Sequence, residues 1–394
     1  MKLTVVTPRY GADVVGGAEL AMRLMAEHLV SQSDWVVEVL TTTALDADRW
    51  LPVLPAGVTE ENGVRVHRFP VTAGRSPDFD ARSRVVLRKP LLVDESEQWA
   101  WIDAQGPLSV DLDEAVRSTD ADVVAASPYL FPPVARAVLA SRPPVLFHPA
   151  AHDEPPMRLP VFADVFAAAS GFAFYTESER RVVQDHFGFV ARRPQAVVGL
   201  GVDGGEGEAP AARAALGLGE RPYIVVLGRV DENKGSALAV ELFSAYKRRR
   251  PGPLMLVFAG PVVHPPPVHP DVVVAGRIDE ATKWGLLRGA VALLSPSVYE
   301  SFSFVVLEAW TAGIPAIVQA ACAATREHAE ASGAGLVFDG YLAFEVILDR
   351  VLGDRDLASA LAARGRLYVD GNFRWPIVIE RYRRLVEAVA AGTR

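Results

Sequence analysis

The chain has 394 residues, half of them hydrophobic, which is long for one domain and favours two. Its net charge of −8 argues against a protein that binds nucleic acid. The single cysteine, Cys322, excludes an intrachain disulfide, and no apolar run of about 20 residues or signal-peptide core is present, so we expect a cytoplasmic protein.

The first half of the chain alternates between short apolar runs and helical patterns, which is typical of an α/β protein with parallel sheets. Between residues 70 and 108 the pattern is irregular, with four basic residues at 82–89 and Trp99 and Trp101 beyond them. This region is interpreted either as a loop for an acidic or sugar acceptor or as a solvated insertion. We expect strands at residues 3–7, 36–40, 64–69, 123–126, 145–147, 172–175 and 196–198.

Gly16 and Gly17 lie between the first expected strand and a helix over about residues 19–30. A strand, a glycine turn and a helix N-terminus together favour anion binding. The spacing of the glycines does not give the G-x-G-x-x-G pattern of dinucleotide-binding proteins. A tight turn that requires positive φ is the alternative interpretation.

Two histidines follow the strand at 145–147, where ligands bind in parallel sheets. His148 and His152 are four residues apart, but Pro149 weakens a helical metal pair and no third ligand is evident, so we expect no metal site. Asp153 and Glu154 are candidates to orient the imidazole of His152. A polar loop histidine without a catalytic role is the alternative.

The second half of the chain repeats the α/β alternation, after a Gly-, Ala- and Glu-rich stretch over residues 204–219 that we interpret as an interdomain linker. A final helix is expected over residues 377–391. Strands are expected at residues 223–227, 254–259, 271–275, 291–294 and 335–338, with a further one within 311–318.

Arg229 and Lys234 lie between the strand at 223–227 and the following helix. A guanidinium and an ammonium at this spacing can converge on a diphosphate. The G-K-[ST] order of a P-loop is absent. An exposed charged turn is the alternative interpretation.

Glu300 and Glu308 bracket a second junction of a strand, a loop and a helix. On one helix they would lie about 12 Å apart in height and would not meet. If Glu300 lies in the loop, free backbone N–H groups between the two carboxylates suit a phosphate, and the carboxylates suit sugar hydroxyls. A surface glutamate and a glutamate that complements the helix dipole are the alternative.

These motifs resemble those of the retaining glycosyltransferases with the GT-B fold, a large family of which glycosyltransferase family 4 is representative. Glu300 and Glu308 match its E-x7-E motif, Arg229 and Lys234 its G-R-x-x-x-x-K-G pattern, and Gly16–Gly17 its glycine pair. The resemblance implies two Rossmann-like, doubly wound parallel-sheet domains that face each other across a cleft. Residues 1–203 would bind the acceptor, with the helix at 376–394 packing back on them, and residues 204–375 would bind the donor.

The resemblance also assigns roles to residues. Glu300 would hold sugar hydroxyls, Glu308 the ribose, and main-chain groups near Ile278 the base; His152, preferred over His148, would touch the transferred sugar. The family usually has glycine where Ser303 stands, so we expect that side chain to affect donor preference. The implied catalytic residues are His152, Arg229, Lys234 and Glu300; the implied donor-binding residues are Gly16, Gly17, Arg229, Lys234, Ile278, Glu300, Phe302, Ser303, Phe304 and Glu308.

The implied function is transfer of a hexose, with retention, from a UDP- or GDP-linked sugar to a hydroxyl acceptor, without a metal or other cofactor. The acceptor is a polysaccharide, a lipid-linked sugar or a small metabolite, and peripheral contact with the inner face of a membrane is compatible with each. The first helix does not have a strongly basic face. The alternatives are a nucleotide-sugar epimerase on the same fold, an inactive nucleotide-sugar-binding protein and, disfavoured by the missing fingerprint, a nicotinamide dehydrogenase.

Overall fold

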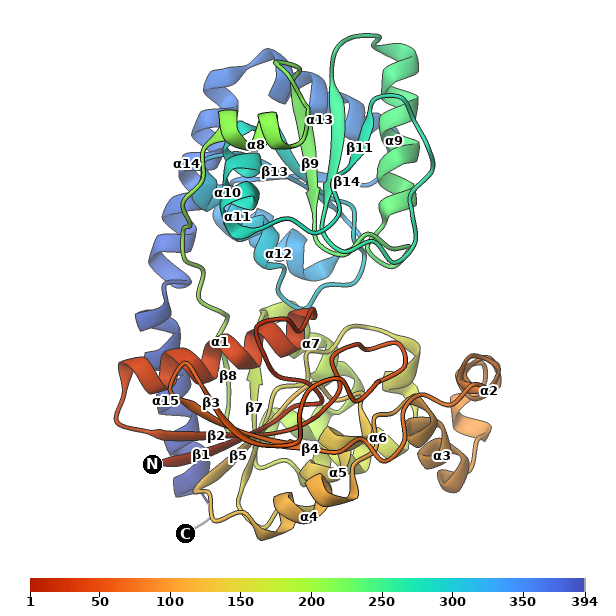
Figure 1. Cartoon of the computed structure of the whole chain (residues 1–394), viewed down its shortest axis with the longest axis vertical. Helices are drawn as coiled ribbons and strands as arrows, with labels where there is room; N and C mark the ends of the chain where they lie inside the picture. The colour runs from red at the N-terminus through yellow and green to blue at the C-terminus, as the bar shows by residue number, and fades with distance from the viewer. Residues whose placement is uncertain (393–394) are drawn as a thin grey trace. The chain divides into compact units, whose positions relative to one another are not determined.

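The computed structural model describes residues 1–392, which form two compact units (Figure 1). Unit 1 comprises Met1–Leu200 together with the chain from Pro376 onward, and unit 2 comprises Gly201–Trp375. The division therefore falls after Leu200, three residues before the position expected from the sequence. In both units helices cover a sheet that is mostly parallel, so the predicted α/β class with two Rossmann-like sheets is confirmed.

Unit 1 contains, within the described residues, an eight-stranded sheet in the order β3-β4-β2-β1-β5-β6-β7-β8. All neighbouring strands are parallel except β3 and β4. The strands are β1 (Lys2–Val6), β2 (Val36–Thr42), β3 (Gly57–Glu61), β4 (Val64–Phe69), β5 (Val123–Ala126), β6 (Val145–Phe147), β7 (Gly171–Phe174) and β8 (Gln195–Val197).

The helices of unit 1 follow the strands along the chain, except for the last one, α15, which returns to this unit from the end of the sequence. They are α1 (Gly17–Gln32), α2 (Phe79–Val86), η1 (Pro90–Leu92), α3 (Glu95–Gln105), α4 (Val110–Ser118), α5 (Pro132–Ala140), η2 (Pro155–Arg158), α6 (Val161–Ala168), α7 (Glu177–His186), η3 (Gly188–Arg192) and α15 (Trp375–Ala391).

The antiparallel pair β3–β4 was not predicted. Its strands are joined by Asn62 and Gly63, both at positive φ (51° and 80°), which is the backbone of a tight two-residue hairpin turn. β3 lies at the sheet edge, and its first four residues are exposed, so it lacks the apolar alternation that marks a half-buried strand.

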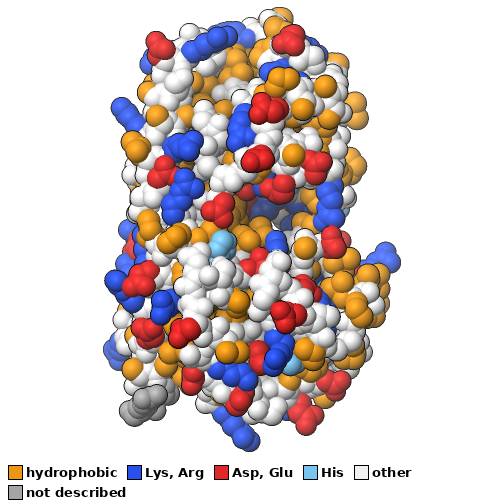
Figure 2. Space-filling model, turned by 60° about the vertical axis from the view of Figure 1, so that its left-hand side comes forward, with side chains coloured by type: hydrophobic (Ala, Val, Ile, Leu, Met, Phe, Trp, Pro, Cys, Tyr) orange, Lys and Arg blue, Asp and Glu red, His pale blue; other side chains and the backbone are white. Residues whose placement is uncertain are grey.

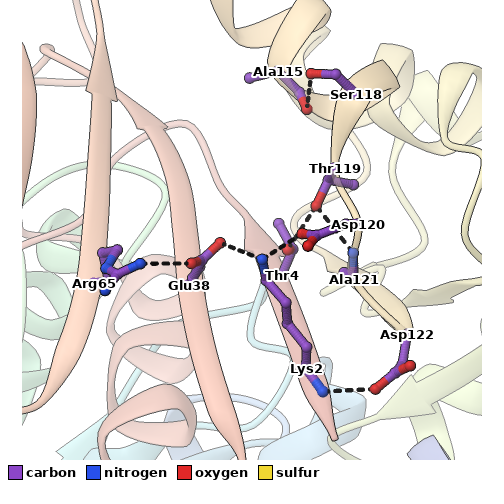
Figure 3. Close-up of polar contacts among 10 residues, drawn as sticks. All are labelled: Lys2, Thr4, Glu38, Arg65, Ala115, Ser118, Thr119, Asp120, Ala121 and Asp122. Carbon is purple, nitrogen blue, oxygen red and sulfur yellow. Dashed lines mark hydrogen bonds and ion pairs between the residues drawn. The ribbon is translucent and has the colours of Figure 1, made fainter.

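An ionic network ties four strands together at the amino edge of this sheet, where β1 begins (Figure 3). The ammonium of Lys2 contacts the carboxylates of Glu38 (3.3 Å) on β2 and Asp120 before β5. Arg65 on β4 pairs with the same Glu38 at 3.3 Å. The backbone amide of Lys2 donates to Asp122 at 2.7 Å. The network fixes strand register at the edge opposite the loops in which ligands bind in such sheets.

The segment expected to be irregular between residues 70 and 108 is largely helical. Trp101 on α3 is buried, donates from its indole nitrogen to Ser83 (2.9 Å) and stacks on Phe79. Trp99 packs partly buried against the same core. The two tryptophans therefore support α2 and α3 from within.

Unit 2 contains, within the described residues, a six-stranded parallel sheet in the order β11-β10-β9-β12-β13-β14. This is the 3-2-1-4-5-6 order of a doubly wound fold, whose direction of winding reverses between β9 and β12. Its strands are β9 (Tyr223–Leu227), β10 (Met255–Ala259), β11 (Val272–Val274), β12 (Ala292–Ser295), β13 (Ala316–Gln319) and β14 (Gly335–Phe338). Its helices are α8 (Ala209–Ala215), α9 (Ser236–Arg249), α10 (Glu280–Gly289), α11 (Phe304–Ala312), α12 (Ala323–Ser332), α13 (Tyr341–Gly353) and α14 (Arg355–Asn372).

The stretch interpreted as a linker, residues 204–219, is a folded part of unit 2, so that prediction is wrong. It contains α8, which packs on α10. A side chain at Gly207 would place its Cβ 2.1 Å from the carbonyl oxygen of Ala281, and Arg288 donates to the carbonyls of Gly205 (2.5 Å) and Gly207 (2.6 Å). Gly205 and Gly207 are therefore required by the close approach of the backbone to α10, whereas Gly217 and Gly219 have positive φ (64° and 56°) after α8.

Each unit has its own hydrophobic core between sheet and helices. On the face shown in Figure 2, acidic and basic side chains are interspersed, without a large area of one sign. Among residues 1–392 no helix combines the length and apolar character needed to cross a bilayer.

Candidate functional site

The loop that follows β9 carries Arg229 and Lys234. Arg229 forms an ion pair with Asp231, and the buried carboxylate of Asp231 also accepts from the backbone amide of Lys234 at 2.9 Å. Gly235 ends the loop at φ 73°, and a Cβ there would lie 2.5 Å from the carbonyl oxygen of Pro296. The glycine is therefore required both by its backbone conformation and by the close approach of the loop after β12.

The loop that follows β12 carries Glu300, which lies outside the helix. Its carboxylate receives a hydrogen bond from the ammonium of Lys234, with 2.6 Å between Nζ and Oε1. Both side chains are partly accessible, at 32% for Lys234 and 18% for Glu300. β9 and β12 are the two strands at which the winding of the sheet reverses, the position at which doubly wound folds bind their ligands.

Ser303 holds the position before α11 and has a left-handed backbone, with φ 72° and ψ 77°. It is the N-cap residue, but its side chain does not cap the helix, and its buried Oγ has no hydrogen-bond partner among the described residues. A left-handed conformation is one that glycine adopts without strain, which is a physical reason for glycine at this position in the family that the sequence resembles.

Glu308 lies on α11 and has a lysine partner of its own. Lys283 on α10 approaches Glu308 Oε1 at 2.9 Å and Glu280 Oε2 at 2.8 Å. Burial lowers the pKa of Lys283, but the carboxylates of Glu308 and Glu280 outweigh it and hold that pKa above its usual value. Sequence reasoning missed Lys283, because its partner on α11 is 25 residues away and no motif marks it. The two glutamates therefore lie in separate ion pairs.

The other predicted donor-binding residues of unit 2 surround these pairs. Ile278, half-buried, lies in the turn before α10, which Asp279 caps by accepting from the amide of Thr282 at 2.7 Å. Phe302 is buried, with its ring 5.1 Å from that of His328 and 5.5 Å from that of Phe373. The packing of the Phe302 side chain against His328 and Phe373 thus holds the Glu300 loop in place. The half-buried Phe304 meets Phe302 edge-on at 5.4 Å.

Gly16 and Gly17 lie in unit 1, where α1 begins at Gly17. Gly16 has an extended backbone (φ 173°), and Gly17 is not at positive φ, so a turn that requires positive φ is not the reason for these glycines. Instead, a Cβ at Gly16 would lie 2.2 Å from the carboxylate of Glu19. Glu19 is held in place by a buried ion pair with Arg9, whose Nε donates at 3.0 Å. Gly16 therefore leaves room for this pair at the N-terminus of α1.

The two histidines after β6 have different surroundings. His148 is fully buried, its Nε2 lies 2.9 Å from the hydroxyl of Tyr382 on α15, and burial lowers its pKa to about 3. His152 is half-buried, and so is the more accessible of the two. The two acids next to it are engaged elsewhere: Asp153 pairs with Arg158 at 2.8 Å, and Glu154 accepts from Tyr129 at 2.8 Å. Burial raises the pKa of Glu154 to about 6.

Within the part of the chain that the structure describes, no group of three or more His, Cys, Asp or Glu side chains is arranged to hold a metal ion. Lys234 pairs with Glu300, and Arg229 lies on the same loop as Lys234, where it pairs with Asp231. The site in unit 2 thus offers an ammonium, a guanidinium and two carboxylates at the carboxyl edge of a doubly wound sheet, which suits a phosphorylated, hydroxyl-rich ligand.

Residues 209–368 match the family model described as "Glycosyl transferases group 1". Unit 2 belongs to the group 1 glycosyltransferase family. The matched residues include Arg229, Lys234, Ile278, Glu300 and Glu308, so the resemblance noted from these motifs is confirmed.

A curated protein that is similar to part of this chain is the GDP-mannose-dependent alpha-(1-6)-phosphatidylinositol monomannoside mannosyltransferase of Mycobacterium tuberculosis. The two are 32% identical over 187 residues, which is 42% of this chain and 48% of the relative. The match therefore spans about half the length of the curated relative.

Solved structures with the same fold match over nearly the full length. Sucrose-phosphate synthase from Thermosynechococcus elongatus aligns with a TM-score of 0.73 at 17% identity, covering 99% of both chains. The Anabaena protein Alr3699/HepE in complex with UDP and glucose aligns with a TM-score of 0.68 at 14% identity, covering 98% of this chain and 100% of that one. At these identities the likeness shows the fold, and the GT-B fold predicted from the sequence is confirmed.

Proposed function

We propose that this protein is a retaining glycosyltransferase that moves a sugar from a nucleotide-diphosphate donor to a hydroxyl acceptor. The observation that carries the proposal is the convergence of two loops at the point where the winding of the unit 2 sheet reverses, which brings Lys234 within 2.6 Å of Glu300 beside Arg229. The group 1 glycosyltransferase match of residues 209–368 supports it.

In this mechanism Arg229 and Lys234 stabilise the negative charge that develops on the diphosphate as its bond to the sugar carbon breaks. The acceptor oxygen attacks the same face of the sugar, and its proton passes to the departing phosphate oxygen. Because Lys234 is paired with Glu300, donor binding exchanges partners: the ammonium turns to phosphate, and Glu300 accepts sugar hydroxyls.

The remaining residues would contact the parts of the donor other than the diphosphate. Glu308 holds the ribose, main-chain groups near Ile278 meet the base, and Ser303 and Phe304 lie near the sugar phosphate at the start of α11. We retain His152 of unit 1 as the residue that touches the transferred sugar, because His148 is buried against Tyr382. Gly16 and Gly17 are the residues of unit 1 that we propose to contact the donor.

For the donor we propose a UDP- or GDP-linked sugar. The mycobacterial relative is named for GDP-mannose and the Anabaena structure contains UDP, and both are nucleoside diphosphates. For the acceptor we favour a lipid-linked sugar and, with it, peripheral membrane contact. Leu91 and Leu92 are each 78% exposed on η1, and Arg88 and Lys89 directly precede that turn.

The test begins with calorimetric binding of UDP, GDP, ADP and NAD, each with and without EDTA. We expect one nucleoside diphosphate to bind. Lys234→Ala should weaken that binding about tenfold or more, because a charge-assisted hydrogen bond to phosphate is lost. Glu300→Gln should leave it unchanged or tighten it, since Lys234 is released from its partner, and yet should abolish turnover of the corresponding nucleotide sugar.

Glu232→Gln is the matched control, because it removes an exposed carboxylate from the same loop without touching the pair. It should behave as the wild type. Binding of NAD alone, or wild-type turnover in either Lys234→Ala or Glu300→Gln, would contradict the proposed function. Conversion of the donor to a second nucleotide sugar without an acceptor would identify an epimerase instead.

A further inference from the structure

Helix α7 begins with Thr-Glu-Ser-Glu at residues 176–179, a sequence typical of a capping box. The first half of the box forms as expected: the amide of Glu179 donates to the hydroxyl of Thr176 at 3.2 Å. In an ordinary box the glutamate at the third helical position reaches back to the amide of the capping residue. The backbone amide of Thr176 does hydrogen-bond the Glu179 carboxyl, and the same carboxyl group also reaches beyond its own helix.

The two oxygens of Glu179 accept from two different segments. Oε2 accepts from the amide of Tyr175 at the end of β7 at 2.7 Å, and Oε1 accepts from the amide of Ala151 at 3.0 Å. Ala151 belongs to the loop after β6, 28 residues earlier in the chain. The carboxyl group therefore joins the start of α7 to the loop that carries His152.

The segment that Glu179 holds has an unfavourable backbone. Ala150, directly before the bonded amide, is at φ 52°, a left-handed conformation that is unfavourable for a residue with a Cβ. Such a conformation persists only where surrounding contacts enforce it, and such residues cluster at functional sites. The residue after the bonded amide is His152.

The burial of the Glu179 carboxyl group carries a desolvation cost. Glu179 is fully buried, and burial raises the pKa of its carboxyl to about 8, although the amides of Tyr175 and Ala151 oppose the rise. A carboxyl group that only capped a helix would remain at the surface, where its desolvation is small.

We propose that Glu179 is a positioning residue for His152, acting through the amide of Ala151 to fix the loop from which that histidine meets the transferred sugar. The inference rests on the proposed function, because it assigns Glu179 a task only if His152 takes part in the reaction. Glu179 itself does not touch the donor.

The experiment measures hydrolysis of UDP-glucose or GDP-mannose, whichever donor the binding panel selects, in wild type, Glu179→Gln, His152→Ala and the double variant. Glutamine can accept at one position only and turns an amide N–H toward the other. We expect kcat to fall on the order of ten- to a hundredfold in each single variant. The affinity for the free nucleoside diphosphate should not change, because the diphosphate ligands Arg229 and Lys234 lie in unit 2 and Glu179 makes no hydrogen bond to the Gly16–Gly17 turn among the interactions of the described residues.

The decisive result is the double variant. If Glu179 acts through His152, the double variant should be no slower than His152→Ala alone, because both substitutions remove the same contribution of His152 to the reaction. Wild-type kcat in Glu179→Gln, or losses that multiply in the double variant, would overturn the proposal. Failure of the wild type to bind any nucleoside diphosphate or hydrolyse a donor would instead count against the proposed function.

Glu177→Gln is the matched control, since it changes the same residue type in the same helical turn, where the carboxylate pairs with Arg180 at 2.5 Å. It should retain wild-type kcat. Circular dichroism and thermal unfolding establish that each variant folds. If Glu179→Gln does not fold, Glu179→Asp, which can still reach Tyr175 but is too short for Ala151, takes its place; unfolding of both variants would overturn the proposal in favour of a role in folding alone.

Discussion

Ser303 shows how one residue can store strain beside a binding site. Its left-handed backbone costs about 1–2 kcal/mol for a residue with a Cβ, and its buried hydroxyl has no partner among the described residues. Both penalties fall on the turn that joins Glu300 to α11. Ser303 thus adopts a left-handed conformation that glycine would adopt without strain.

Replacing Ser303 with glycine should therefore stabilise unit 2. Relief of the backbone strain exceeds the extra unfolded-state entropy of glycine, so we expect a gain of about 1 kcal/mol in the free energy of unfolding. The measurement is urea denaturation, with a higher midpoint and an unchanged slope.

The control for this substitution is Ser236→Gly on α9. Ser236 is also buried with an unpartnered hydroxyl, but it has an ordinary helical backbone, so glycine there should cost about 0.5 kcal/mol. A loss of stability in Ser303→Gly would show that the serine hydroxyl makes a favourable contact.

For single residues, the sequence predicts functional groups that lie in a local motif, but not those whose partners are distant in the sequence. Arg229, Lys234 and Glu300 were found because each follows a recognisable strand in a spaced motif. Lys283 and Glu179 were not assigned a role: one looks like a surface lysine of α10 and the other like an ordinary capping glutamate. Their partners, Glu308 and Ala151, are 25 and 28 residues away, and only the folded chain brings them together.

Among the elements, α2 and η1 present an unusual surface. Val85 is 71% exposed, Leu91 and Leu92 are 78% exposed, and residues 84–92 contain three basic side chains and no acidic one. Exposed leucines beside basic residues suit an anionic bilayer, where each basic residue contributes about 1 kcal/mol.

The paired variant Leu91→Asp/Leu92→Asp should lose binding to vesicles that contain anionic phospholipid, by roughly tenfold or more, because two apolar contacts become charges. Co-sedimentation with vesicles of phosphatidylcholine and phosphatidylglycerol measures this. Leu342→Asp is the control, since Leu342 is 73% exposed on α13 of unit 2. Equal binding by the paired variant and the wild type would exclude this segment as the membrane contact.

The strands and helices differ in how well sequence patterns predict them. Buried strands such as β5, β6 and β9 were predicted at their observed bounds because continuous apolar runs mark them. β3 was missed because it is exposed, although Asn62-Gly63 is the turn signal that could have found it. α8 was taken for part of a linker because the glycines that flank it suggest flexibility, whereas its alanines favour a helix and Gly205 and Gly207 before it serve close packing.

For the whole molecule, the main feature is that unit 1 is built from two separated parts of the chain. α15 returns to the sheet of unit 1: Tyr382 lies against His148, and Val389 lies where a Cβ at Gly171 would come within 2.4 Å. Beyond Trp375, its buried apolar side chains are Val378, Ile379, Tyr382, Leu385, Val386 and Val389.

A chain that ends at Trp375 should therefore lose the folded state of unit 1 while unit 2 remains folded. Burial of six apolar side chains contributes roughly 10 kcal/mol, about the whole stability of a typical domain. Hydrogen exchange locates the effect: amides of β6 and β7 should lose protection, and those of β9 and β10 should keep it. Protected β6 and β7 amides in the shortened chain would contradict this.

The position of α15 also has a consequence for the order of events on the ribosome. Domains fold as units while the chain emerges at about 5–20 residues per second. All strands of unit 1 leave the ribosome first, yet the surface around His148 and Gly171 stays uncovered until the whole of unit 2 has been synthesised. Of the two units, unit 1 is thus translated before unit 2 but completed after it, and its incomplete form is the species that a chaperone would meet.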